Sequence, residues 1–161
     1  MLNIHVITVG RDKESWVSEQ IDHYRKLLTK YTRLELTVVP EAAYTKAADL
    51  SKALRSEAGV IRARLKGGYL FVLDPGGRMY TTESLAGEID RLKSSGHSLL
   101  EFVIGGPFGL DPSLKQIDKQ AGSGQVISLS PLTMSHQIVR LVLLEQLYRV
   151  CNFSAGGSYH K

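Results

Sequence analysis

The sequence of 161 residues predicts an α/β fold in which helices flank a mostly parallel β-sheet. Two observations support this prediction. Short β-rich runs alternate along the chain with segments of helical periodicity, which is the pattern of a parallel sheet built from strand–helix units. The runs at residues 69–73 and 99–104 are apolar throughout, as is typical of strands buried on both faces. The length suits one domain spanning residues 1–161.

The first half of the chain contains two strands, each followed by a helix. Residues 2–9 form the first predicted strand, which ends at Gly10, and residues 34–39 form the second, which Pro40 stops. The apolar positions of the first helix are spaced four and three residues apart, at Val17, Ile21, Tyr24, Leu28 and Tyr31. Those of the second helix, which ends at Gly67, are Leu50, Leu54, Ala58, Ile61 and Leu65.

A third strand and helix follow. The strand covers residues 69–73, and residues 74–77 (Asp-Pro-Gly-Gly) predict a turn after it. Thr81 or Thr82 can cap the next helix, because a threonine oxygen accepts a hydrogen bond from a free backbone N–H of the first turn. The helix ends at Gly96, and its inner face contains Leu85, Ile89 and Leu92.

The last third of the chain predicts a strand at 99–104, a glycine-rich loop at 105–109, a short helix from Asp111, a fifth strand at 126–129 and a final helix at 136–151. This final helix is apolar nearly all round, at Ile138, Val139, Leu141, Val142, Leu143, Leu144, Leu147 and Tyr148. One domain does not need so much apolar surface on a single helix. A symmetric homodimer is the commonest way to bury the surplus.

The composition favours a cytoplasmic protein over a secreted, a membrane-spanning or a disulfide-bonded one. No basic region precedes the short apolar run at the N-terminus, so the chain does not begin as a signal peptide does. No apolar stretch reaches the roughly 18 residues that a membrane span requires. The single cysteine, Cys151, excludes an internal disulfide and a multi-cysteine metal site.

The net charge of +4 permits an anionic partner without requiring one. The whole excess lies before Gly68, where twelve Lys/Arg face eight Asp/Glu. Solvated helix faces explain this excess equally well. The sequence contains no basic run interleaved with aromatic residues of the kind that binds single-stranded nucleic acid.

Three loops at predicted strand ends are candidates for a ligand site, at residues 74–78, 105–109 and 130–135. Ligands of parallel α/β sheets bind beyond the carboxyl ends of the strands. The middle loop has three glycines in five residues, which lets a ligand approach the main chain closely. A Rossmann site is excluded because the first strand–helix turn offers only Gly10, and no Walker motif is present.

The five histidines do not predict a metal site, since no pair has metal-binding spacing. His5 alternates with apolar residues of the first strand and is expected to be structural. His136 opens the last helix beside the third loop, a position where histidine is more often structural than catalytic. The polar tail ends in Tyr159-His160-Lys161, and a tail of this composition would ordinarily fray.

Three segments together make the chain recognisable. They are IGGPFGL at residues 104–110, LSPLTMSHQIVRLVLLEQLYR at 129–149 and the closing YHK. In this order and spacing they resemble the ribosomal RNA large subunit methyltransferase H family, which belongs to the SPOUT class, and the similarity spans the whole chain. Ser135 departs from the pattern, because many relatives have proline there, and Pro131 lies inside the third loop.

The resemblance implies a SPOUT-type fold with a C-terminal trefoil knot, a rare exception to the rule against knots. It implies a homodimer that binds S-adenosyl-L-methionine (SAM) and methylates N3 of a pseudouridine in 23S ribosomal RNA on the assembled ribosome. Neither DNA nor a membrane is an expected partner, and no metal is expected. The positions that match the family's SAM site are Leu73, Gly105, Leu129, Ser130, Pro131, Leu132, Thr133 and Met134.

The predicted catalytic residues are His160, Tyr159 and Arg140. N3 of a pseudouridine is an imide nitrogen and must lose its proton, so His160 and Tyr159 are expected to provide the general base, acting on the SAM of the neighbouring subunit. Arg140 is expected to hold a phosphate or the uracil oxygens, and His136 is a weaker candidate for the base. Three alternatives stay open: a SPOUT methyltransferase with another rRNA or tRNA target, a non-catalytic ribosome-binding module, and an α/β nucleotide-binding protein that would prefer nucleotides to SAM.

Overall fold

Five strands form one sheet in the order β2-β1-β4-β3-β5. They are β1 (Leu2–Val9), β2 (Thr32–Val39), β3 (Tyr69–Met79), β4 (Leu99–Ile104) and β5 (Gly124–Ser128). The structure is a computed structural model, and it describes residues 1–116 and 123–158. Within these ranges every pairing between the five strands is parallel, which confirms the predicted parallel sheet.

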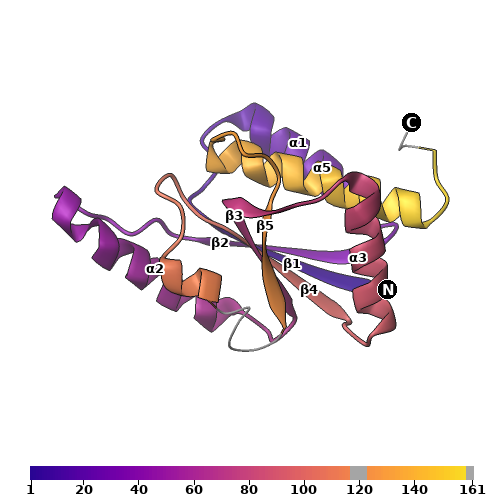
Figure 1. The fold of residues 1–161 in the computed structure, drawn as a ribbon. Coiled ribbons are helices and arrows are strands. Elements are labelled where there is room, and N and C mark those ends of the chain that lie inside the picture. The colour runs from indigo at the N-terminus through magenta and orange to yellow at the C-terminus, as the bar shows by residue number, and fades with distance from the viewer. Residues whose placement is uncertain (117–122, 159–161) are drawn as a thin grey trace.

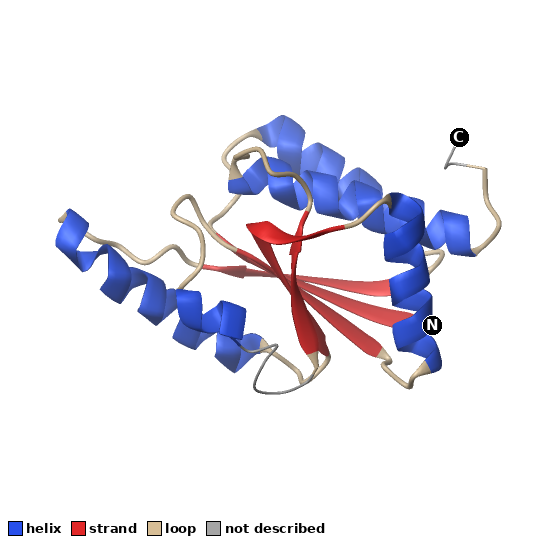
Figure 2. Ribbon diagram, viewed as in Figure 1, coloured by secondary structure: helices blue, strands red, loops and turns tan. Residues whose placement is uncertain are grey.

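Helices cover both faces of the sheet, as Figures 1 and 2 show. One face is covered by α1 (Ser15–Leu28), α3 (Thr82–Ser94) and α5 (His136–Ser154), and the other by α2 (Leu50–Arg64) and the 3₁₀ helix η2 (Pro112–Gln116). A second 3₁₀ helix, η1 (Ala47–Asp49), leads into α2. Among the helices of the described residues, none is both long enough and apolar enough to span a bilayer.

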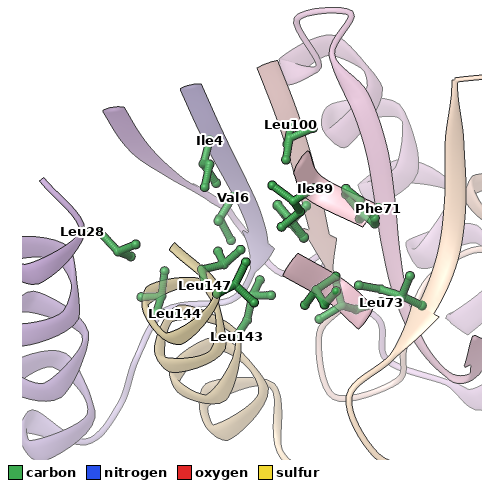
Figure 3. Close-up of a cluster of buried hydrophobic side chains, with 14 of the residues drawn as sticks. Ile4, Val6, Leu28, Phe71, Leu73, Ile89, Leu100, Leu143, Leu144 and Leu147 are labelled. Atoms are coloured by element: carbon green, nitrogen blue, oxygen red, sulfur yellow. The ribbon is translucent and has the colours of Figure 1, made fainter. Parts of the chain in front are cut away.

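The larger of two hydrophobic clusters lies between the sheet and the three helices of the first face. In Figure 3, Leu143, Leu144 and Leu147 of α5 lie opposite Ile4 and Val6 of β1. All five side chains are at most 1% exposed. Burial of a leucine side chain stabilises a fold by about 1.5–3 kcal/mol, so α5 is a principal source of stability for this layer.

Helix α5 packs between α1 and α3, which accounts for part of its unusual apolar breadth. The flanking helices supply two lateral surfaces in addition to the sheet below. Ile138, Leu141 and Val142 are nevertheless only half-buried. The homodimer inferred from this helix therefore stays a prediction, and these three side chains are the apolar surface that it would cover.

One prediction about local structure was wrong. Strand β3 does not stop at Leu73, because Leu73 and Arg78 both pair with Ile127 and the four residues between them leave the ladder as a bulge. Helix α2 forms as predicted, although Leu50 and Leu54 at its start are only half-buried, because the helix leans away from the sheet there (Figure 1). Other boundaries moved by at most three residues: β2 begins at Thr32, and α5 continues to Ser154.

His5 is structural, as predicted. Its ring is 2% exposed, its Nδ1 lies 3.1 Å from Glu101 Oε1, and its Nε2 lies 2.8 Å from Thr37 Oγ1. The buried Glu101 carboxylate also accepts hydrogen bonds from the backbone N–H groups of Lys66 (2.9 Å) and Gly68 (2.7 Å). These bonds satisfy a charge that would otherwise be costly to bury, and they fix the turn between α2 and β3.

Candidate functional site

A pocket lies beyond the carboxyl ends of β4 and β5 and beside the bulge of β3, where the three loops singled out by the sequence meet the start of α5. Because these strands are parallel neighbours, their carboxyl ends share one edge of the sheet. Seven of the eight residues predicted to bind SAM line this pocket, and only Pro131 does not. The seven are Leu73, Gly105, Leu129, Ser130, Leu132, Thr133 and Met134.

The glycine loop forms one wall of the pocket and folds tightly upon itself. Gly109 donates its N–H to the carbonyl of Gly106 (3.0 Å), and Gly109 has a φ of 80°, which favours glycine. A Cβ on Gly105 would lie 2.6 Å from the backbone of Gly109. The residue at 105 must therefore be glycine for the loop to close, and the closed loop presents main-chain groups to the pocket.

The loop from Leu129 to Ser135 forms the opposite wall. Ser128 Oγ donates to the carbonyl of Ser130 (2.9 Å), and Ser130 Oγ accepts from the N–H of Leu132 (3.0 Å). Ser135 caps α5, because its Oγ accepts from the N–H of Ile138 (3.4 Å). The hydroxyl groups of Ser128 and Ser130 therefore fix the conformation of the loop, and that of Ser135 joins the loop to α5.

Asp74 introduces a negative charge at the rim of the pocket. It is the first residue of the β3 bulge, it forms an ion pair with Lys115, and it accepts the N–H of Gly76 (3.0 Å). Burial opposes ionisation of this carboxyl, but the hydrogen bonds from Lys115 and Gly76 outweigh it and lower the pKa of Asp74 below its ordinary value. The carboxylate is therefore ionised at neutral pH.

His136 closes the pocket at the end of β1. It is 9% exposed, and its Nε2 has no hydrogen-bond partner among the described residues. A Cβ on Gly10 would lie 3.2 Å from this Nε2 and 3.6 Å from Glu41 Oε2, so the three groups converge on one point. Sequence reasoning identified His136 only as a weak candidate and missed Gly10 and Glu41, which come from a different part of the chain.

Of the three predicted catalytic residues, the described structure places only Arg140, so their meeting stays a prediction. Tyr159 and His160 lie outside the described residues. Arg140 is 3% exposed and is not among the residues that line the pocket; it forms an ion pair with Asp12 (2.7 Å) and donates to the carbonyl of Gly10 (2.8 Å). Burial lowers the pKa of Arg140, and Asp12 opposes that shift, so the guanidinium stays charged. Arg140 thereby fixes the end of β1 next to His136.

Comparison with known proteins shows what the chain resembles as a whole. Residues 2–160 match the model of a family described as predicted SPOUT methyltransferases. A protein of Heliobacterium modesticaldum is 40% identical over 166 residues and one of Desulforamulus reducens 37% over 165, with all of both chains covered. Both are named ribosomal RNA large subunit methyltransferase H. The chain therefore belongs to the SPOUT methyltransferases and, among them, to the ribosomal RNA large subunit methyltransferase H family.

Proposed function

We propose that the protein uses SAM to methylate N3 of a pseudouridine in 23S ribosomal RNA, acting on the assembled ribosome. The observation that carries this proposal is the convergence of three loops, each selected from the sequence, on one pocket at the carboxyl edge of the sheet. The names of the relatives give the RNA class, and the family resemblance supplies the methyl donor and the target nitrogen.

The residues of the pocket fit SAM. Apolar side chains of Leu73, Leu129 and Met134 suit a purine ring, and the exposed main chain of the two loops can supply hydrogen bonds to its polar edge. Asp74, kept ionised by Lys115, is an anionic group suited to the cationic end of the donor. SAM supplies an electrophilic methyl group when it is bound.

The protein's own residues have two tasks in the reaction. The loops must hold donor and acceptor in line, and such orientation accounts for most of the catalysis in a transfer of this kind. The N3 proton must then be removed, which we assign to His160 and Tyr159, with general-base catalysis of roughly 10²–10⁴-fold. We assign Arg140 the positioning of the β1 end through Gly10, and direct contact of Arg140 with the RNA stays a prediction.

Two further proposals concern architecture. The chain passes through its own loop at the C-terminus to form a trefoil knot, as the resemblance implies. Two copies associate through α5, whose half-buried Ile138, Leu141 and Val142 form the apolar surface for that contact. In such a dimer the tail of one subunit can serve the pocket of the other, which accounts for a catalytic motif placed at the end of the chain.

Two experiments test the proposed function. Isothermal titration calorimetry with SAM should show one site per chain. No binding at millimolar SAM would instead favour a non-catalytic ribosome-binding module. Mass spectrometry of ribosomal RNA from a strain lacking the gene should show the loss of one methyl group on a pseudouridine of 23S RNA. If a different modified nucleotide is lost instead, the protein is a methyltransferase, but its target is not the proposed pseudouridine.

A further inference from the structure

We propose that Tyr44 and Phe108 form an exposed stacking surface for an unpaired base of the RNA substrate, next to the base that is methylated. This inference rests on the proposed function as an rRNA methyltransferase. It adds a recognition element that the sequence did not reveal, since the two residues come from separate segments, the link between β2 and η1 and the glycine loop.

The two rings are in contact and accessible. Their centroids are 5.3 Å apart and their planes meet at 85°, an edge-to-face arrangement. Tyr44 is 37% exposed and Phe108 is 51% exposed, and neither belongs to the hydrophobic clusters of the core. A single exposed aromatic residue needs no explanation, but these two meet from distant segments, and because their planes are nearly perpendicular a base can stack on the face of one ring while its edge meets the other.

The position of the pair relates it to the pocket. Gly106 and Pro107 line both the SAM pocket and the small cavity beneath Tyr44 and Phe108. Phe108 therefore belongs to the same loop that forms a wall of the pocket and lies on its other side. A nucleotide adjacent to the target in a single strand could stack here while the target base lies next to the methyl donor.

Cationic residues are frequent in the η1–α2 segment, which follows Tyr44 and extends beyond the sheet (Figure 1), whereas the cavity that the two rings line also contains Glu41 and Glu57. Residues 44–64 contain five Lys/Arg and two Asp/Glu, and one of these acids, Glu57, is buried. Exposed Glu41 and Asp49 oppose this charge but are outnumbered. Among the described residues, no ion pair involves Lys46, Lys52 or Arg55.

Arg62 of α2 contacts the segment that follows the glycine loop, since its Nη2 donates to Ser113 Oγ (2.6 Å). The pKa of Asp111, three residues after Phe108, is lowered first by its hydrogen bond from Ser113 and also by the charges of Arg62 and Arg55. Both cations are therefore within electrostatic reach of the segment that carries Phe108. Aromatic rings that stack on bases, together with cations that contact phosphates, are the usual means of binding single-stranded RNA.

The test measures methyl transfer to ribosomal particles that lack the modification. Tyr44→Ala and Phe108→Ala should each raise the KM for the particles roughly tenfold or more, while kcat and the Kd for SAM stay within twofold of the wild type. Tyr44→Phe and Phe108→Tyr keep the rings and should behave like the wild type. Arg55→Gln should reduce the slope of log KM against log salt by about 0.7, as expected for one lost phosphate contact.

Three results would overturn the inference: an unchanged KM in both alanine variants, an equal loss of SAM affinity, or a change in oligomeric state by light scattering. An equal loss of SAM affinity would mean that the rings only stabilise the pocket. A change in oligomeric state would mean that they form a contact between copies of the chain. Co-sedimentation of each variant with ribosomal particles tests stacking even if the wild type transfers no methyl group. Wild-type protein that neither binds nor methylates the particles would overturn the proposed function together with the inference.

Discussion

Replacement of Gly105 by alanine tests whether the closed glycine loop builds the cofactor pocket. The new Cβ would lie 2.6 Å from the carbonyl carbon and oxygen of Gly109 and 2.9 Å from Leu110 Cγ. Non-bonded carbon atoms approach to about 3.5 Å, so the Gly109 backbone must retreat by roughly 0.9 Å. The loop can do this only by opening the hydrogen bond between Gly109 and Gly106.

The cost of this change should appear mainly in SAM affinity. Overpacking of this kind costs about 1–3 kcal/mol, and the free protein relieves it by opening the loop. SAM can bind only if the loop closes again, so its Kd should rise by a factor of roughly 5 to 150. Calorimetry measures the Kd, and thermal unfolding monitored by circular dichroism verifies that Gly105→Ala is folded.

Gly106→Ala is the matched control. Its Cβ would meet only the side chain of Val9, at 3.1 Å from Cγ1, and a shift of roughly 0.4 Å relieves that contact without touching the loop backbone. We expect a loss of less than about fivefold in SAM affinity. If Gly105→Ala binds SAM within twofold of the wild type, or if both variants lose equal affinity, the reasoning from loop closure is refuted.

Three other substitutions test parts of the fold. Arg140→Met should lower the free energy of unfolding in urea by about 3 kcal/mol, because Asp12, whose side chain is only 16% exposed, then loses its ion-pair partner. A loss below about 1 kcal/mol would contradict the buried ion pair. Burial, only partly offset by the N–H of Ala42 and reinforced by the charge of Glu41, raises the pKa of Glu57 above its ordinary 4.5. The neutral form therefore stabilises the fold below pH 4.5, and this contribution is lost as the pH rises through the raised pKa. In Glu57→Gln the free energy of unfolding should fall less as the pH rises from 4.5 through the raised pKa of Glu57. An unchanged dependence of stability on pH would contradict a raised pKa at Glu57. Gly59→Ala should stabilise the protein by about 0.5–1 kcal/mol, since a Cβ in mid-helix α2 meets nothing within 4 Å; a lower melting temperature would count against it.

Local patterns predicted the elements well because their causes are local. The spacing of Val17, Ile21 and Leu28 makes a helix with one apolar face whatever lies opposite, and all three are buried. The bulge in β3 could not be foreseen in the same way. Its form depends on Leu73 and Arg78 both pairing with Ile127, and a contact between β3 and β5 leaves no mark in the sequence around residues 74–77.

In the candidate site too, local patterns predicted some features, and contacts between distant segments decided the others. Seven of the predicted cofactor residues meet in one pocket, because loops at the carboxyl ends of neighbouring parallel strands must share an edge. Arg140 was expected in contact with the substrate, yet in this structure its charge is paired with Asp12. The sequence offered no signal for that pair, since its members are far apart along the chain and each is an ordinary charged residue.

The sequence by itself determined an α/β fold with a parallel sheet and the three strand-end loops that form the pocket, because periodicity and glycine placement act on the chain locally. Only the tertiary structure decided which side chains meet. Strand order and register bring His136 to Gly10 and Glu41, and Tyr44 to Phe108. Such contacts arise from packing summed over the whole core, so no short segment of the sequence encodes them.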